Sequence, residues 1–306
     1  MKKSKLIVIT GPTASGKSAL AVSLAQKFDT EIISADSRQI YKGIPIVTAV
    51  PSLEEQGGIT HHLIETLPLD AYYSAARFQE DAMAIIDSLF KEKEFVIVCG
   101  GSMLYIDALV KGIDELPTVP EDIRNTLMKE WQKKGDDWLL TQLSLLDPDY
   151  LKVVDRKNMK RIFHAVEISL TAKVPYSSLL TSRNKMKKDF PYEVVKFCLS
   201  GDRASLFERI NKRTISMIEA GLEEEARRVY PLKHLNSLNT VGLKEMFLYF
   251  EGKFTREEAI ARIQKNTRVY AKKQITWHKR DSDISYLDFS DSPETNAKKV
   301  LELVLD

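Results

Sequence analysis

The segment at residues 11–18 has the residue types and spacing of a phosphate-binding loop. An apolar run at residues 6–9 precedes it and a helical pattern at residues 19–25 follows, giving the order strand, glycine-rich loop and helix. In that order, backbone N–H groups and the positive end of the helix face a bound phosphate. Lys17 adds a positive charge, and the Ser18 hydroxyl is a ligand for Mg²⁺. The loop consists of Gly11, Pro12, Thr13, Ala14, Ser15, Gly16, Lys17 and Ser18. This nucleotide-binding type of motif, common in ATP-binding proteins, predicts a pyrophosphate site.

A carboxylate, Asp36, follows the second apolar run, at residues 31–35. Ligands of open α/β sheets bind beyond the carboxyl ends of the strands, so we expect Asp36 in the same crevice as the loop. There it can act as a general base, as a magnesium ligand through water, or only as a cap of the next segment. The residues alone leave these three roles open.

The third run, at residues 95–99, ends in Gly100, Gly101 and Ser102. These small residues expose backbone groups and a hydroxyl at the same end of the sheet, or else they form a plain tight turn. The run does not end in the acidic residue with which many ATPases hold Mg²⁺. The chain also has no Asn-Lys-x-Asp motif for guanine. A nucleotide-hydrolysing switch is therefore disfavoured.

Basic residues gather in two segments. Residues 266–280 contain five Lys or Arg, two large aromatic residues and no acidic residue. That mixture suits phosphate contact with base stacking, as in single-stranded RNA recognition, but also a solvated helix face with Tyr270 and Trp277 turned inward. The second segment, at residues 156–161, is weaker by itself. Arg209 and Arg213 stand one helical turn apart and can clamp a pyrophosphate or pair with nearby acids.

Bulk composition indicates an ordinary globular protein. The chain has 306 residues, 43% of them hydrophobic and 29% charged, with a net charge of +2, so any surface for nucleic acid must come from local clustering. Cys99 and Cys198 lie in apolar runs and predict buried thiols without a disulfide. No apolar stretch is long enough to cross a membrane, and the amino terminus does not resemble a signal peptide, which favours a cytoplasmic protein.

Five apolar runs predict strands at residues 5–10, 31–35, 95–99, 194–199 and 284–289. Helical patterns separate the first three, which predicts an α/β fold with a parallel sheet flanked by helices, as in P-loop NTPases. Residues 117–190 show helical periodicity only, and prolines bracket the stretch. We therefore expect a core domain at 1–116 and 191–306 with an all-helical insertion domain at 117–190. Further helical patterns cover residues 211–230 and 256–279.

In order along the chain, these blocks resemble the bacterial tRNA dimethylallyltransferases, also called isopentenyl-tRNA or IPP transferases. The matching segments are residues 11–18, 34–42, 61–63, 73–78, 100–105, Gly242 with Lys244 and Glu245, and 267–277. Many activities use a phosphate-binding loop, whereas residues 34–42 combined with the basic-aromatic segment are specific to this family. The resemblance covers nearly the whole chain.

The resemblance implies that the dimethylallyl group of dimethylallyl diphosphate moves to N6 of an adenosine, with release of diphosphate. That adenosine is tRNA position 37, directly 3′ of the anticodon, in tRNAs reading codons that begin with U. It further implies Mg²⁺ as cofactor and a P-loop core and insertion domain with the tRNA anticodon stem-loop between them. We also expect a monomer that acts without a membrane.

Roles for individual residues follow from the resemblance. Asp36 is the base that also holds the adenine amine, and Ser102 supplies a hydroxyl near the reacting groups. The loop with Lys17 and a Mg²⁺ on Ser18 stabilises the leaving diphosphate, joined by Arg213 and Arg209. The target base must leave the stacked anticodon loop to reach this crevice. The implied tRNA contacts are Asp36, Ser37, Arg38, Gln39, Ser102, Arg124, Lys160, Arg161, Gly242, Lys244, Arg268, Lys272, Lys273, Trp277 and Arg280.

Several positions depart from the family pattern. They are Val47 and Val50 for Gly and Lys, Leu243 for Tyr, His164 for Arg, His278 for Phe, Arg156 for Pro, and Ser for Thr at 18 and 102. Most lie in the implied tRNA-binding segments. Two other functions stay open: a P-loop small-molecule or nucleotide kinase, which would turn over ATP, and an RNA-binding protein without catalysis.

Overall fold

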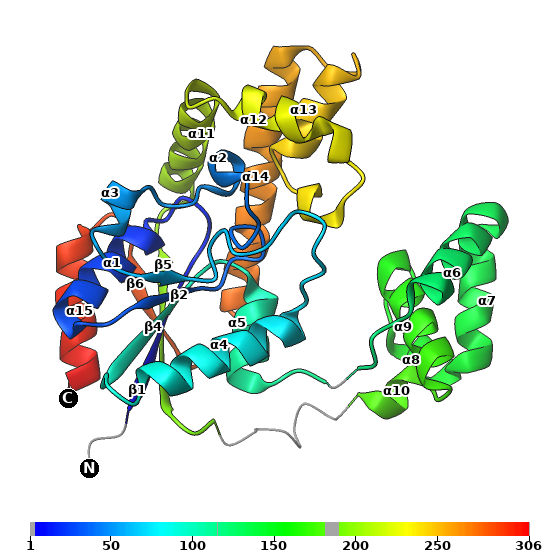
Figure 1. Ribbon diagram of the computed structural model, residues 1–306, viewed down its shortest axis with the longest axis horizontal. Coiled ribbons are helices and arrows are strands. Elements are labelled where there is room, and N and C mark those ends of the chain that lie inside the picture. Colours follow the sequence, from blue (N-terminus) through cyan, green and yellow to red (C-terminus); the bar gives the residue numbers. More distant parts are fainter. Residues whose placement is uncertain (1–3, 115, 181–189, 306) are drawn as a thin grey trace. The chain divides into compact units, whose positions relative to one another are not determined.

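The computed structural model describes residues 4–114, 116–180 and 190–305 (Figure 1). The chain divides into two compact units. The sheet unit combines residues 1–110 with 190–306, and the helical unit covers residues 111–189. The sequence placed the insertion at residues 117–190, of which residues 181–189 lie outside the described part.

The sheet unit alternates strands and helices in its first half and is mostly helical in its second. Its strands are β1 (Lys5–Thr10), β2 (Ile32–Ser34), β3 (His61–His62), β4 (Phe95–Cys99), β5 (Glu193–Ser200) and β6 (Ile284–Asp288). Its helices are α1 (Lys17–Phe28), α2 (Pro45–Thr48), α3 (Leu53–Gln56), α4 (Ala75–Leu89), α5 (Met103–Lys111), α11 (Arg203–Glu219), α12 (Leu222–Val229), α13 (Leu243–Phe250), α14 (Arg256–His278) and α15 (Pro293–Leu305), with short 3₁₀ turns η1 (Tyr230–Leu232) and η2 (Asn236–Leu238).

The described strands form one parallel sheet in the order β3-β2-β4-β1-β5-β6. β1 lies inside the sheet, pairing Lys5 with Phe95 of β4 and with Glu193 of β5. Such a sheet needs apolar residues on both faces of its inner strands, and Leu6 to Ile9 are fully buried. The predicted α/β fold with a parallel, helix-flanked sheet is confirmed.

Helices cover both faces of the sheet. Ile7 and Ile9 point into a cluster with α1, α11 and α15. Because side chains alternate along a strand, Leu6 and Val8 point to the opposite face. There Val8 shares a small pocket with Met103 and Ile106 at α5 and with the end of α14. The carboxyl ends of β1, β2 and β4 therefore lead into one region between the flanking helices.

The helical unit has a core of its own. It consists of α6 (Glu121–Lys134), α7 (Asp136–Leu146), α8 (Pro148–Val153), α9 (Met159–Ala172) and α10 (Tyr176–Leu179). Leu139 and Leu143 of α7 are fully buried against Ile162 and Val166 of α9. This spacing of buried residues matches the predicted helical periodicity.

The structure confirms the five predicted strands and adds one. β3 consists only of His61 and His62, too short and too polar to be recognised as a strand. The helical pattern at residues 211–230 is interrupted at Gly221, whose φ of 98° lets α12 begin in a new direction. Both cysteines are buried and free, as predicted. In the described residues, no helix has the length and apolar character needed to cross a membrane.

Candidate active site

The phosphate-binding loop joins β1 to α1 through three residues with positive φ. Gly11, Ala14 and Gly16 have φ values of 144°, 64° and 91°. A Cβ at residue 11 would lie 2.7 Å from the carbonyl oxygen of Leu199 in β5, so only glycine fits there. The chain therefore turns back over the first turn of α1, where the helix N–H groups have no partners within the helix.

The loop contains a buried hydroxyl without a partner. Ser15 Oγ forms no hydrogen bond with any residue that the structure describes, although the side chain is buried. An unpaired buried hydroxyl costs roughly 1–3 kcal/mol. Because hydroxyls donate readily to phosphate oxygens, this atom favours an anion in the loop.

The Lys17 ammonium lies over the loop and donates to the carbonyl oxygen of Pro12 at 2.8 Å. Burial, together with the nearby Arg213 charge, lowers the pKa of Lys17 to about 8 against the opposing charge of Asp36. A bound diphosphate would counter both effects and hold the lysine charged.

The two arginines of α11 have different positions. Arg213 Nη1 donates to Thr13 Oγ1 at 3.3 Å, so this guanidinium borders the loop. Burial lowers the pKa of Arg213, which marks a cation held out of water. Arg209 is exposed and stacks on the Phe289 ring, 4.7 Å from its centroid. Of the predicted pair, the structure brings Arg213 into contact with the loop.

Asp36 and Ser102 meet where β2 and β4 end. Asp36 Oδ1 accepts from the N–H groups of Arg38 at 2.9 Å and Gln39 at 3.4 Å, so the carboxylate does cap the next turn. In the described residues its other oxygen, Oδ2, accepts no hydrogen bond and is available to a substrate. Ser102 Oγ accepts from the N–H of Ser37 at 2.8 Å.

A glycine brings these two turns together. A Cβ at Gly100 would lie 2.1 Å from the carbonyl oxygen of Ala35, the residue before Asp36. The Ser102 N–H also donates to that oxygen, at 3.1 Å. The glycines after β4 therefore hold Ser102 directly beside the Asp36 turn.

A small pocket adjoins the loop on the β2 side. Its lining combines polar and apolar side chains: Ser18, Ala21, Ile32, Ser34, Gln39, Pro51, His61, Ile64 and Cys99. Burial raises the pKa of the Cys99 thiol to about 11, so this residue is a neutral wall and no nucleophile at neutral pH.

Arg38 and Gln39, both predicted to contact tRNA, make internal hydrogen bonds. Arg38 Nη1 donates to the carbonyl oxygens of Asn236 at 2.9 Å and Ser237 at 3.1 Å. Gln39 Nε2 donates to the carbonyl oxygen of Ala49 at 2.9 Å. In this structure both side chains fix neighbouring segments around the Asp36 turn.

Most of the basic-aromatic segment lies on α14. Arg268 donates to Asn211 Oδ1 at 2.5 Å, and the Arg268 and Lys272 cations lie 6.0 and 5.4 Å from the Phe207 ring centroid on α11. Lys272, Lys273 and Arg280 are exposed, and the Arg280 guanidinium lies 5.7 Å from the half-buried Trp277 ring. Lys273, Trp277 and Arg280 follow one another at i, i+4 and i+7, a spacing that places cations and an aromatic ring on one side of the helix and of the turn that ends it.

Gly242 has a positive φ of 104° at the start of α13, where its N–H donates to Glu245 Oε2. A Cβ there would lie 2.4 Å from Val47 Cγ2, so one of the departures from the family pattern fills the space beside this glycine. Lys244 is exposed in the first turn of α13. Buried Glu225 holds the Val47 segment by accepting from the N–H groups of Ile46 and Val47.

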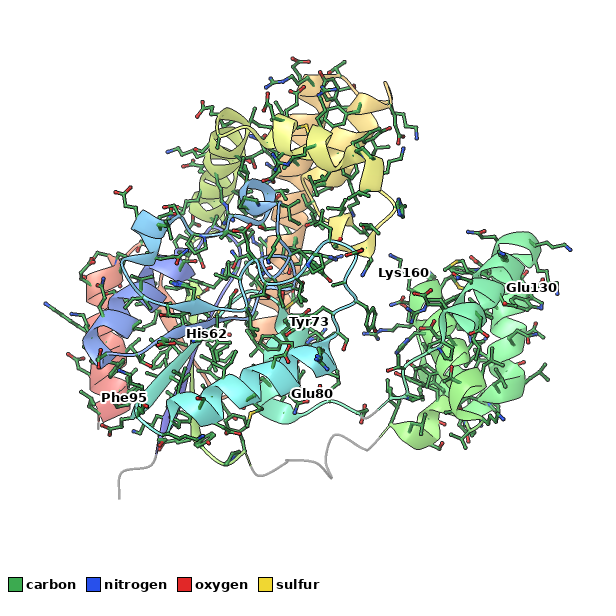
Figure 2. The ribbon with its side chains drawn as sticks, in the orientation of Figure 1. His62, Tyr73, Glu80, Phe95, Glu130 and Lys160 are labelled. Carbon is green, nitrogen blue, oxygen red and sulfur yellow. The ribbon has the colours of Figure 1, made fainter. Side chains whose placement is uncertain are left out.

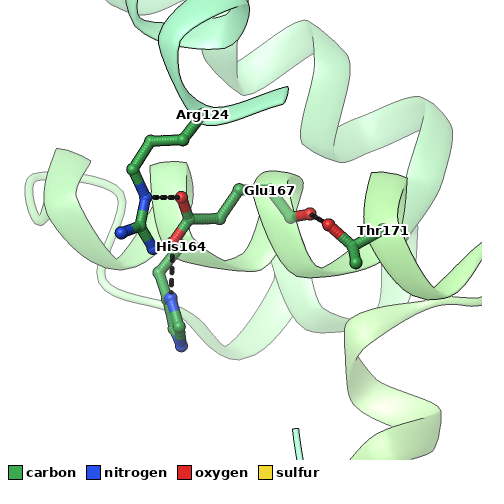
Figure 3. A network of polar contacts seen from close by, with 4 residues as sticks. All are labelled: Arg124, His164, Glu167 and Thr171. Atoms are coloured by element: carbon green, nitrogen blue, oxygen red, sulfur yellow. Dashed lines mark hydrogen bonds and ion pairs between the residues drawn. The ribbon is translucent and has the colours of Figure 1, made fainter. Parts of the chain in front are cut away.

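The remaining predicted tRNA contacts lie in the helical unit. Lys160, labelled in Figure 2, is exposed on the first turn of α9. Arg161 is exposed on the same turn. Arg124 instead forms a two-point contact with buried Glu167, at 2.8 and 3.1 Å, and His164 Nδ1 lies 2.9 Å from the same carboxylate (Figure 3). Glu167 thus fixes a guanidinium and an imidazole at the surface of this unit.

Sequence reasoning missed the site contacts of three polar residues, Thr10, Gln274 and His278. Gln274 Oε1 accepts from the N–H of Thr13 at 2.9 Å, and Gln274 Nε2 donates to the carbonyl oxygen of Gly101 at 2.9 Å. His278 Nε2 lies 3.3 Å from Thr10 Oγ1. Gln274 stands in a segment matched to the family, but a glutamine inside a helix has no pattern that indicates its partners.

At the carboxyl end of the parallel sheet, a loop bordered by Lys17 and Arg213 follows β1, and the Asp36 carboxylate follows β2, with β4 between the two strands. These features define a P-loop protein of the α/β class with an inserted helical unit. Comparisons with known proteins specify the class further. The sequence pattern of the family described as IPP transferase matches residues 39–281. This chain belongs to that family.

Individual relatives agree with this assignment. The chain is 47% identical to a tRNA dimethylallyltransferase 1 of Phocaeicola vulgatus over 91% of its own length and 92% of that protein. A tRNA isopentenylpyrophosphate transferase of Bacillus halodurans has a similar structure, with a TM-score of 0.73 and 32% identity over 99% of this chain and 96% of that one. A eukaryotic dimethylallyltransferase that acts on tRNA aligns with a TM-score of 0.79 and 27% identity over 93% of this chain and 74% of that one.

Proposed function

We propose that this protein is a tRNA dimethylallyltransferase. It transfers the dimethylallyl group of dimethylallyl diphosphate to N6 of the adenosine at tRNA position 37, in tRNAs that read codons beginning with U. The carrying observation is the position of Asp36, whose turn is held beside Ser102 at the same end of the sheet as the phosphate-binding loop. Membership of the IPP transferase family supports the choice of reaction.

The reaction needs help on two sides. The adenine amine is a poor nucleophile, because its lone pair is delocalised into the ring. In the transfer step, N6 forms a bond to C1 of the allyl group while the bond from C1 to the diphosphate oxygen breaks. Asp36 takes the proton that N6 loses, which maintains a neutral amine as the new bond forms. The Ser102 hydroxyl, held beside the Asp36 turn, helps to position the amine.

The diphosphate carries away the bonding electron pair, so charge develops on its oxygens. Lys17, Arg213 and the Ser15 hydroxyl border the loop and stabilise that charge. Arg213 reaches the loop from α11. Arg209 would need to leave the Phe289 ring to join it.

The residues present also suit Mg²⁺. This ion binds through one or two protein oxygens, substrate phosphates and several waters. Ser18 is exposed at the first turn of α1 next to the loop, and Asp36 Oδ2 is available for a contact through water. In the described residues, no cluster of three or more His, Cys, Asp or Glu forms a protein-only metal site. Mg²⁺ would therefore arrive with the diphosphate and neutralise its charge.

The predicted tRNA surface consists of the exposed cations of α14 and α9, with Lys244. Lys272, Lys273 and Arg280 are suited to phosphates, and Trp277 to a base. The anticodon stem-loop supplies both. We place the enzyme in the cytoplasm, where its tRNA substrate is found, and expect it to act as a monomer.

The decisive experiment combines the protein with an unmodified tRNA transcript, Mg²⁺ and dimethylallyl diphosphate, followed by nucleoside analysis. We expect N6-(dimethylallyl)adenosine, and diphosphate release that requires both substrates. A transcript with guanosine at position 37 is the matched control and should remain unmodified. Phosphate transfer from ATP without any prenylated adenosine would support the kinase alternative and overturn this proposal, as would binding of tRNA without chemistry.

A further inference from the structure

One face of α14 contacts the backbone of both turns of the site. Gln274 is at the centre of this face and is 1% exposed. Its amide lies between two main-chain groups that are 88 residues apart in sequence, the Thr13 N–H and the Gly101 carbonyl oxygen, each at 2.9 Å. The amide therefore uses its acceptor on the phosphate-binding loop and its donor on the turn after β4.

The residues one helical turn away on either side contact the turn after β4 and the end of β1. The Tyr270 hydroxyl lies 3.5 Å from the Gly101 carbonyl oxygen. On the other side, the Thr10 hydroxyl donates to the Gly100 carbonyl oxygen at 3.2 Å, so His278 Nε2 must carry the proton that it shares with Thr10 Oγ1. Burial lowers the pKa of His278 to about 4, which keeps the imidazole neutral.

These contacts connect the part of the site that would bind the diphosphate of the prenyl donor to the part that would bind the acceptor adenosine. Thr13 belongs to the loop and also meets Arg213 through its hydroxyl. Gly101 directly precedes Ser102, which binds the N–H of Ser37, the residue after Asp36. A single side chain, Gln274, therefore lies between the cradle for the leaving group and the turn that carries the base.

The backbone is shaped for this amide. A Cβ at Gly101 would lie 2.5 Å from Gln274 Nε2, so position 101 leaves room only for glycine while the amide is in place. Among the described residues, removing the amide would leave the part-buried Thr13 N–H without this acceptor and the Gly101 carbonyl oxygen with only the long Tyr270 contact at 3.5 Å, so the two turns would be free to shift.

We propose that Gln274 is a positioning residue that fixes the phosphate-binding loop relative to the Ser102–Asp36 turn. This inference rests on the proposed function for its kinetic consequence, although the contact itself does not depend on it. It also assigns the Thr13 N–H to Gln274, so that this amide is not among those that hold the diphosphate.

The first test uses Gln274→Met, which keeps the volume and removes both hydrogen bonds. Misplacement by about 1 Å can lower a rate about 10²-fold, so we expect kcat to fall about 10²-fold. The KM for tRNA should change less than about threefold, because the exposed face of α14 is intact. Gln264→Met, on the same helix, is the matched control and should retain wild-type kcat. Wild-type kcat in Gln274→Met would overturn the proposal.

The second test does not need activity. Hydrogen exchange of the Thr13 amide can be measured by NMR or by mass spectrometry of the loop peptide. The amide should be protected in the wild type and should exchange at least about tenfold faster in Gln274→Met. Unchanged exchange would refute the contact. This readout also separates the two proposals, because a protein with no prenyl transfer but a protected Thr13 amide would disprove the function and keep the contact.

The Gly101→Ala variant covers the case in which Gln274→Met folds poorly, and where both fold, a double-mutant cycle tests whether they break the same contact. Gly101→Ala places a methyl group against the amide and should lower kcat in the same way. If both changes break one contact, the double variant should be no more than about threefold slower than the slower single variant. Rate losses that simply multiply would show that the two residues act independently and would overturn the proposal.

Discussion

Replacing Asp36 separates its two roles, because one carboxylate oxygen caps the turn and the other is available to substrate. In Asp36→Asn, the amide oxygen can still accept from the Arg38 and Gln39 N–H groups, at 2.9 and 3.4 Å in the wild type. The ability to take a proton is lost. General base catalysis contributes about 10²–10⁴-fold, or roughly 3–5.5 kcal/mol of barrier. We expect that loss in kcat with stability unchanged within about 0.5 kcal/mol.

Asp36→Ala is the matched comparison. It removes the base and both cap hydrogen bonds, one of them long, so we expect the same rate loss together with about 1 kcal/mol of lost stability. Single-turnover prenylation with labelled dimethylallyl diphosphate measures the chemical step, and urea unfolding measures stability. Activity of Asp36→Asn within threefold of the wild type would refute the role as base. Equal destabilisation of the two variants would refute the capping argument.

Four further changes test other parts of the structure. Gly242→Ala should lower the free energy of unfolding in urea by about 2 kcal/mol, because residue 242 has a φ of 104° and its Cβ would lie 2.4 Å from Val47. In a double-mutant cycle, Val47→Gly should restore at least about 0.5 kcal/mol of that loss, and strict additivity would contradict the contact. Lys17 has its pKa lowered to about 8 in the free protein, so KM for dimethylallyl diphosphate should rise as pH increases above 8, and a flat profile from pH 7 to 9.5 would disagree. Glu167→Gln should destabilise the helical unit by about 1–3 kcal/mol, as measured from the change in Trp131 and Trp138 fluorescence on unfolding. Unchanged unfolding would show that the Arg124 contact is weak. Burial raises the pKa of Glu167, but His164 and Arg124 outweigh it and lower the pKa below the unfolded value near 4.5. The stabilisation by Glu167 is therefore present above pH 4.5 and should be lost as pH falls through the lower folded pKa. Acid unfolding that is identical in wild type and Glu167→Gln would contradict this.

The sequence predicted the inner strands well, because a strand buried on both faces has an unmistakable apolar run. β1, β4 and β5 have such runs. Asp36 follows the shorter run of β2, and the prediction that it lies near the loop came from the rule that ligands bind beyond the carboxyl ends of the strands. β3 was missed because two histidines on an edge carry no such pattern. The loop's residue types were equally clear, since few other structures require glycine and lysine at those positions.

The partners of long polar side chains could not be predicted from spacing. Arg209 and Arg213 are one helical turn apart and looked equivalent, but the Phe289 ring, far along the chain, holds the first, while Thr13 meets the second. Arg38 looked like a surface cation and binds carbonyl oxygens of η2. Gln274 gave no chemical signal at all, because its partners are backbone groups on two distant turns.

The position of β1 in the sheet has a consequence for how the chain is made. Lys5 pairs with Phe95 on one side and with Glu193 on the other. At about 5–20 residues per second, a ribosome needs roughly 5–20 s to synthesise the stretch between these two partners. The helical unit, which has its own core, can fold during that interval, while the apolar strand β1 waits with one edge unpaired. Nascent chains halted before residue 193 should therefore bind chaperones or aggregate through that edge.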